Sequence, residues 1–145
     1  MSPIDRVSTQ NKLARLNEII RLLQELGAHP KENFMIDKTL QSATMYDLVI
    51  GIEIISDVGN HFLAELGDAN SKSYREIILR LGARKIIPET FANANQEMAG
   101  FRNKLIHDYD RVSEEKVYGY LQEAPKIFAQ FFDYYNTFLE KQRPE

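Results

Sequence analysis

The chain has 145 residues, a formal net charge of −3, a hydrophobic fraction of 43% and a charged fraction of 27%. These values fit one soluble domain with a hydrophobic core, so we expect a single domain over residues 1–145. The lack of cysteine excludes a disulfide scaffold, a cysteine-ligated metal site and a cysteine nucleophile. Proteins that coat nucleic acid are usually basic, so any such contact by this acidic chain should come from a local patch.

The sequence shows no membrane or export signal. No apolar run approaches the roughly 20 residues that a membrane span needs. The N-terminus, Met1–Arg6, lacks the charged and then apolar layout of a signal peptide. We therefore expect a cytoplasmic protein with no membrane partner.

Hydrophobic periodicity and helix-end signals predict five helices. They are expected at about residues 3–26, 32–66, 74–81, 88–107 and from 114 onward, without an alternating β pattern or an internal repeat. Ser73 and Glu76 have the spacing of a capping box at the start of the third helix. Long helices joined by short turns predict an all-α, antiparallel bundle of four to five helices.

Three of these helices carry apolar stripes at helical spacing. The residues expected to face the core are Leu16, Ile19, Ile20, Leu23 and Leu26 in the first helix, Phe91, Ala94, Met98, Phe101 and Leu105 in the fourth, and Val117, Leu121, Ala124, Phe128, Phe131, Tyr135 and Phe138 in the fifth. The long second helix contains Gly51 and Gly59. Glycine inside a helix costs about 1 kcal/mol relative to alanine, so we expect another helix to approach closely at both points.

The segment Gly100–Asp110, at the end of the fourth predicted helix, contains the residues best suited to chemistry. A histidine side chain is able to take up and release a proton near neutral pH, so the residue type of His107 suits a general base or acid. Arg102 offers a planar fork that matches phosphate and stabilises developing negative charge. Metal-independent cleavage of RNA requires both kinds of group. A structural arginine and histidine at a helix end have the same spacing, so the pair alone leaves both interpretations open.

Helix geometry adds a condition to this pair. Five positions place Arg102 and His107 about 140° apart around a regular helix, so they do not share a face. Asn103, four residues before His107, is placed to orient the imidazole, and Tyr109 lies seven positions after Arg102. A second copy of the helix across a two-fold axis would bring such segments into one cleft. We therefore predict a homodimer.

A second polar set lies in the long second helix. Glu53, Asp57 and His61 follow one another at intervals of four residues. A histidine with carboxylates at this spacing is able to bind a divalent metal, or the carboxylates pair with an arginine of a neighbouring helix. We favour pairing of Asp57 or Glu53 with Arg102, because a half-buried arginine needs a partner, and we predict no metal site.

Basic residues gather near the end of the third predicted helix. Arg80, Arg84 and Lys85 lie close to one turn and are the local candidates for contact with a phosphate backbone. A solvated turn has the same composition, so both interpretations remain.

The segment Arg102-Asn103-Lys104-Leu105-Ile106-His107-Asp108-Tyr109 resembles the R-x4-H-x-Y motif of the HepT-like HEPN family. Flanking segments agree with the same family, and the resemblance spans roughly residues 5–140. The supporting segments are Met98–Asn103, Tyr109–Val112, Ser73–Glu76, Gly51–Glu53 and Asp57–His61.

The resemblance implies a HEPN fold of four to five helices that dimerises with the motif at the subunit interface. It also implies a toxin, a metal-independent endoribonuclease that acts on mRNA or tRNA and needs no cofactor. Arg102 and His107 match the catalytic positions of the family. Tyr109 matches the tyrosine that a minimal nucleotidyltransferase antitoxin of the MntA type modifies with AMP.

A function of a different class is a catalytically idle helical partner that docks a nucleotidyltransferase or a nucleotide. It needs the same fold and the same dimer. The presence of Arg102, His107 and Tyr109 together favours the ribonuclease, because an idle scaffold has no need for all three.

Overall fold

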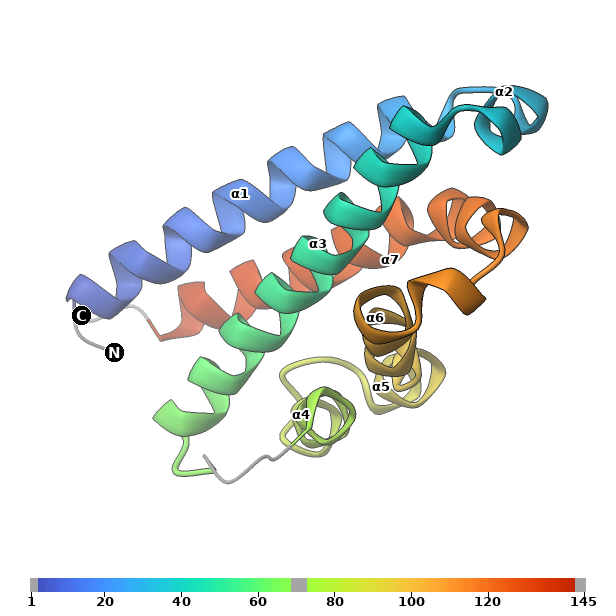
Figure 1. Ribbon diagram of the computed structural model, residues 1–145. Coiled ribbons are helices and arrows are strands. Elements are labelled where there is room, and N and C mark those ends of the chain that lie inside the picture. The colour runs from blue at the N-terminus through green and yellow to red at the C-terminus, as the bar shows by residue number, and fades with distance from the viewer. Residues whose placement is uncertain (1–2, 69–72, 143–145) are drawn as a thin grey trace.

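The computed structural model describes residues 3–68 and 73–142, and this part of the chain contains helices and no strand (Figure 1). The predicted all-α class is therefore confirmed. The elements are α1 (Pro3–Gly27), α2 (Lys31–Ile36), α3 (Lys38–Glu65), α4 (Tyr74–Ala83), α5 (Glu89–Asn95), α6 (Met98–His107), the 3-10 helix η1 (Tyr109–Arg111) and α7 (Glu114–Lys141). None of the described helices is both long enough and apolar enough to cross a membrane.

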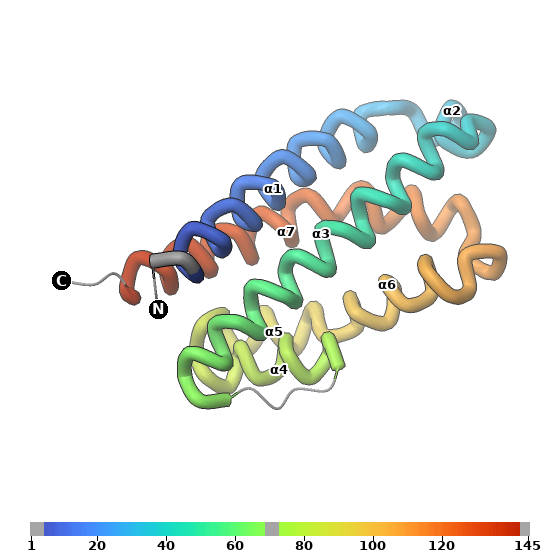
Figure 2. Tube along the Cα trace, turned by 60° about the vertical axis from the view of Figure 1, so that its left-hand side comes forward, coloured from blue at the N-terminus to red at the C-terminus, as the bar shows by residue number. Residues whose placement is uncertain are grey.

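The three long helices α1, α3 and α7 pack against one another and form the body of the bundle. Figures 1 and 2 show that α1 runs antiparallel to α3 and α7, and that these two run in the same direction. Helices α4, α5 and α6 return the chain from the end of α3 to the start of α7 (Figure 2). Both α4 and α6 pack against α3, so α3 contacts neighbours on several sides.

The prediction of one continuous helix over residues 32–66 is wrong in one respect, because the helix is interrupted at Asp37. This residue has an extended backbone, with φ −106° and ψ 103°, and ends α2. Its carboxylate accepts hydrogen bonds from the backbone N–H groups of Thr39 and Leu40, at 2.9 and 3.1 Å. An aspartate in this position satisfies donors that a helix start leaves free, so a new helix, α3, begins there.

The predicted helix over residues 88–107 is also interrupted, between α5 and α6. The side chain of Asn95 donates to the carbonyl of Phe91 at 2.9 Å, and that of Gln96 donates to the carbonyl of Asn93 at 3.0 Å. Side-chain bonds of this kind compete with the helical ladder. Within α5, Ala94 is exposed, contrary to prediction, and Ala92 is buried.

The core follows the predicted stripes of the first and last helices. The α7 residues from Val117 to Tyr135 in that stripe are buried, and Phe138 is partly buried. The capping box is also confirmed in part, because the Ser73 hydroxyl accepts from the Glu76 N–H at 3.1 Å.

Both glycines of α3 lie where another helix approaches. A Cβ atom on Gly51 would lie 2.3 Å from the Phe128 ring, and one on Gly59 would lie 2.6 Å from the Tyr135 hydroxyl. That hydroxyl donates to the carbonyl of Ile55 at 2.7 Å. The predicted close helix contacts are therefore confirmed.

We predict that Gly51→Ala lowers the free energy of unfolding by about 1–3 kcal/mol, because the added methyl group overpacks the contact with Phe128. Gly119→Ala is the matched control, since nothing lies within 4 Å of a Cβ at this exposed helical position. The control should be up to about 1 kcal/mol more stable than the wild type. Urea denaturation followed by circular dichroism measures both. Equal stability of the two variants would contradict the close contact.

Candidate active site

Arg102 is the best-anchored residue of the motif. It lies on α6 with a side chain only 18% exposed, and its Nη2 donates to Oε1 of Glu53 on α3 at 2.6 Å. The guanidinium carbon also lies 4.9 Å from the centre of the Tyr74 ring on α4, within the range of a cation–π contact. The predicted pairing of Arg102 with Asp57 or Glu53 is confirmed, with Glu53 as the partner.

The guanidinium retains hydrogen-bonding capacity. Its Nη1 donates to Oδ1 of Asn103 at 3.1 Å, while Nε is buried and has no hydrogen-bond partner in the described part of the chain. A buried donor without a partner is unfavourable by about 1–3 kcal/mol. The surroundings of Arg102 are therefore not optimised for stability alone.

His107 and Tyr109 lie at the other end of the motif and are exposed. His107 is in the last turn of α6, where the free carbonyl groups favour a cation. Tyr109 begins η1 and is 66% exposed. Asn103 accepts from Arg102 and makes no hydrogen bond to the imidazole of His107 among the described residues. Its role in orienting that ring stays a prediction.

The predicted polar set of α3 does not act as a unit. Glu53 contacts Arg102, Asp57 is exposed, and Nε2 of His61 lies 3.7 Å from Oε1 of Glu65. Residues four apart on a helix turn by about 40° each time, so Glu53 and His61 face different neighbours. Of the two carboxylates predicted to pair with Arg102, Glu53 rather than Asp57 makes the contact.

A groove of about 600 Å³ lies beside the motif, between α6 and the start of α7. Lys104, Arg111 and Lys116 line it, together with the acidic Glu97 and Asp108. This cationic group was not predicted from the sequence, because its members come from three different elements. Their positions on either side of the predicted turn between the last two helices were the available signal.

Two aromatic rings form one wall of this groove. Phe101 of α6 and Tyr120 of α7 stack with their centroids 3.8 Å apart and their planes within 4°. Burial raises the pKa of Tyr120 to about 12, with smaller contributions from Glu123 and Glu97. The phenol therefore stays neutral at physiological pH, and the wall is an uncharged aromatic surface next to three cations.

Two of the basic residues near the end of α4, Arg80 and Arg84, are engaged in structural contacts. Arg80 forms ion pairs with Asp68 and Glu76. Arg84 donates to the carbonyl of Leu66 at 2.9 Å, and Lys85 adopts a left-handed backbone with φ 60°. Their predicted contact with a phosphate backbone stays a prediction, and these bonds compete with it.

Comparisons with known proteins agree with the motif. A family model described as "Ribonuclease HepT-like" matches residues 16–134. A putative RNase of Archaeoglobus fulgidus is 28% identical over 134 residues, which cover 91% of this chain and 96% of the relative. A protein named mRNA nuclease HepT from Shewanella oneidensis is 26% identical over 123 residues, which cover 85% and 92% of the two chains.

Solved structures show the same fold. A tri-AMPylated HEPN toxin of Shewanella oneidensis, solved in complex with an MNT antitoxin, matches with a TM-score of 0.81 and 25% identity. The match covers 94% of this chain and 99% of that toxin. The family match extends over most of the sequence and includes the Arg102–Tyr109 motif. The chain therefore belongs to the HepT-like ribonuclease family.

Proposed function

We propose that this chain is the toxin of a HEPN toxin–antitoxin pair, a metal-independent endoribonuclease that acts in the cytoplasm on mRNA or tRNA. The observation that carries the proposal is the half-buried Arg102, held at 2.6 Å by Glu53 and followed by the exposed His107 and Tyr109. Two relatives, one named a putative RNase and the other an mRNA nuclease, support the same activity.

The proposed reaction uses the 2′-hydroxyl of RNA as its nucleophile. His107 removes the proton from this hydroxyl, the 2′-oxygen attacks phosphorus, and the bond to the 5′-oxygen breaks. A proton delivered to that 5′-oxygen balances the one removed, so the products are a 2′,3′-cyclic phosphate and a 5′-hydroxyl. Arg102 stabilises the charge that develops on the phosphorane oxygens. Side chains supply both the acid–base group and the positive charge, so the scheme needs no metal.

The groove beside α6 is the best candidate path for the RNA strand. Lys104, Arg111 and Lys116 attract phosphates, and the Phe101–Tyr120 wall provides a surface on which a base can stack. These cations are better placed than Arg80, which already has two carboxylate partners.

We predict that Arg102→Ala and His107→Ala each lower the rate of RNA cleavage by roughly a hundred- to ten-thousandfold, which is typical for the loss of a positioned catalytic group. Matched controls are Arg21→Ala, an arginine 60% exposed, and His29→Ala, an exposed histidine. The controls should cleave RNA at the wild-type rate, and cleavage should persist in EDTA.

Gel analysis of a labelled RNA, with identification of the cyclic phosphate, measures these rates. Wild-type activity in Arg102→Ala and His107→Ala would contradict the catalytic roles assigned to these residues. Absence of cleavage by the wild-type chain itself would instead identify it as a non-catalytic partner of a nucleotidyltransferase. Complete loss of cleavage in EDTA would contradict the metal-independent scheme.

The positions of Arg102 and His107 favour a homodimer through α6. Asn103 and Ile106 occupy the helix surface between them, and Ile106 is 37% exposed although it is apolar. A second copy that covers this surface would complete a cleft with the arginine and histidine of both subunits. In such a dimer, arginine and histidine side chains of two copies of α6 would face one cleft, which a single helix does not allow.

We predict that light scattering at micromolar concentration gives about twice the chain mass of 16.8 kDa. Ile106→Asp should shift this mass toward the monomer, because a charge would be buried at the interface. Ile36→Asp is the matched control, since Ile36 is 84% exposed on α2. A fully active wild-type monomer would refute the proposed dimer.

We further propose that Tyr109 accepts AMP from the antitoxin. The phenol oxygen attacks the α-phosphorus of ATP, and pyrophosphate leaves. The 66% exposure of Tyr109 makes it accessible to another protein. A nucleotide there would place negative phosphate two residues from His107 and within the same motif as Arg102, where it would repel substrate phosphate.

Co-expression with the cognate nucleotidyltransferase should add one or more AMP units to the peptide that contains Tyr109, as intact-mass and peptide spectrometry would measure. Tyr109→Phe should remove the addition, whereas Tyr46→Phe should retain it, because Tyr46 is a similarly exposed tyrosine on α3. Neutralised wild-type toxin without any added AMP would show that docking alone inhibits it.

A further inference from the structure

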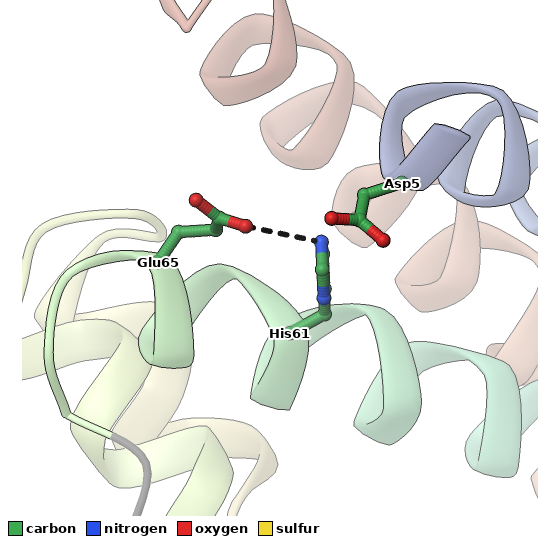
Figure 3. Close-up of side chains that lie close together, drawn as sticks. All are labelled: Asp5, His61 and Glu65. Carbon is green, nitrogen blue, oxygen red and sulfur yellow. Dashed lines mark ion pairs between the residues drawn. The ribbon is translucent and has the colours of Figure 1, made fainter. Parts of the chain in front are cut away.

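A group of potential metal ligands lies outside the motif, where α1 begins and α3 ends (Figure 3). Asp5 comes from the first turn of α1, and His61 and Glu65 lie one turn apart at the end of α3. One candidate ligand atom from each residue lies within 4.8 Å of the other two. Figure 3 shows the imidazole between the two carboxylates.

The imidazole of His61 adds a second observation at this cluster. Nε2 of His61 is buried and has no hydrogen-bond partner among the described residues. Oε1 of Glu65 lies 3.7 Å from this nitrogen, which is too long for a hydrogen bond. A buried polar nitrogen is unfavourable without a partner, and a metal ion between the three side chains would provide one.

We propose that Asp5, His61 and Glu65 bind a divalent transition-metal ion, with zinc as the best match. Zinc accepts imidazole and carboxylate ligands together, whereas calcium and magnesium prefer oxygen ligands alone. Bonds of about 2.1 Å in tetrahedral geometry separate ligand atoms by roughly 3.4 Å. The 3.7 Å separation of Nε2 and Oε1 is already close to this value, and water would complete the fourth position.

The two carboxylates have competing uses. Asp5 and Glu65 take part in further interactions, which the metal would have to share or replace. A protonated imidazole between the carboxylates is the alternative state of the same cluster. Zinc binding and protonation exclude each other at Nε2, so a direct titration with zinc distinguishes the two.

The site would join helices rather than act on RNA. It connects the start of α1 to the end of α3, where Arg6 of α1 also donates to the carbonyl of Leu139 near the end of α7 at 3.1 Å. Glu53, the partner of Arg102, lies eight residues before His61 on α3, about 12 Å along the helix axis. The proposed metal is thus structural and independent of the catalytic scheme above.

Calorimetric titration with zinc chloride of the chelator-treated, tag-free chain should give one site per chain. The midpoint temperature of thermal unfolding should rise by roughly 5–10 °C when the free zinc concentration exceeds the dissociation constant a hundredfold. His61→Ala should weaken binding by more than about a hundredfold, since even changes to groups that merely orient a ligand cost 10- to 100-fold. Asp5→Asn, which keeps the side-chain shape, should also weaken binding and serves if His61→Ala does not fold.

His29→Ala is the matched control and should bind zinc as the wild type does, because His29 lies in the turn between α1 and α2. The proposal is overturned if zinc produces no heat and no shift in unfolding temperature. It is also overturned if His61→Ala and Asp5→Asn keep wild-type affinity. RNA cleavage measured on the same preparations should be equal with and without zinc, so a failure of this site and a failure of the ribonuclease proposal give different results.

Discussion

The close approach of α3 to α7 at Gly51 is the constraint on which the other contacts depend. The Phe128 ring occupies the space of a side chain at this position, so α3 lies directly against the aromatic stripe of α7. Glu53 is two residues further on, about 200° around the helix, and therefore faces away from α7 toward α6. Glycine on one face of α3 thereby sets the position of the carboxylate that holds Arg102.

The same helix contributes side chains to two separate polar clusters. At its middle, α3 contributes Glu53 to an ion pair with a motif residue. At its end, it contributes His61 and Glu65 to a cluster with α1. Removing one partner of a buried ion pair lowers the stability of a protein more than replacing both partners with apolar residues, because a desolvated charge remains. Glu53 and Arg102 therefore belong to the fold as much as to the candidate site.

Local and periodic features were predictable from the sequence. The α7 stripe repeats at intervals of three and four residues, and Ser73 stands directly before α4 as its cap. That Arg102 pairs with a carboxylate of this helix, either Glu53 or Asp57, followed from the need of a half-buried arginine for a partner. These inferences require only a regular helix and a rule about burial.

The missed features depend on where a helix stops or on which distant elements meet. Apolar residues continue at helical spacing across Asp37 and across Gln96, so this spacing did not predict the helix ends at these positions. In the structure, side-chain hydrogen bonds of Asp37 and Gln96 accompany the two ends. Lys104 and Lys116 line one groove only because the chain reverses near η1. Asp5 reaches His61 through tertiary packing that no spacing in the sequence encodes.

The ion pair of Arg102 has a consequence for selectivity among anions. An anion that takes over the hydrogen bond of Nη2 must first displace the carboxylate of Glu53 at 2.6 Å. A small anion that contacts one arginine alone, such as free phosphate, gains too little binding free energy to offset the loss of the Arg102–Glu53 ion pair. A polyanion that neighbouring cations also hold gains more, because several contacts share one loss of translational freedom. In the proposed function, the carboxylate thus sets a threshold that separates an RNA strand from the abundant small phosphates of a cell.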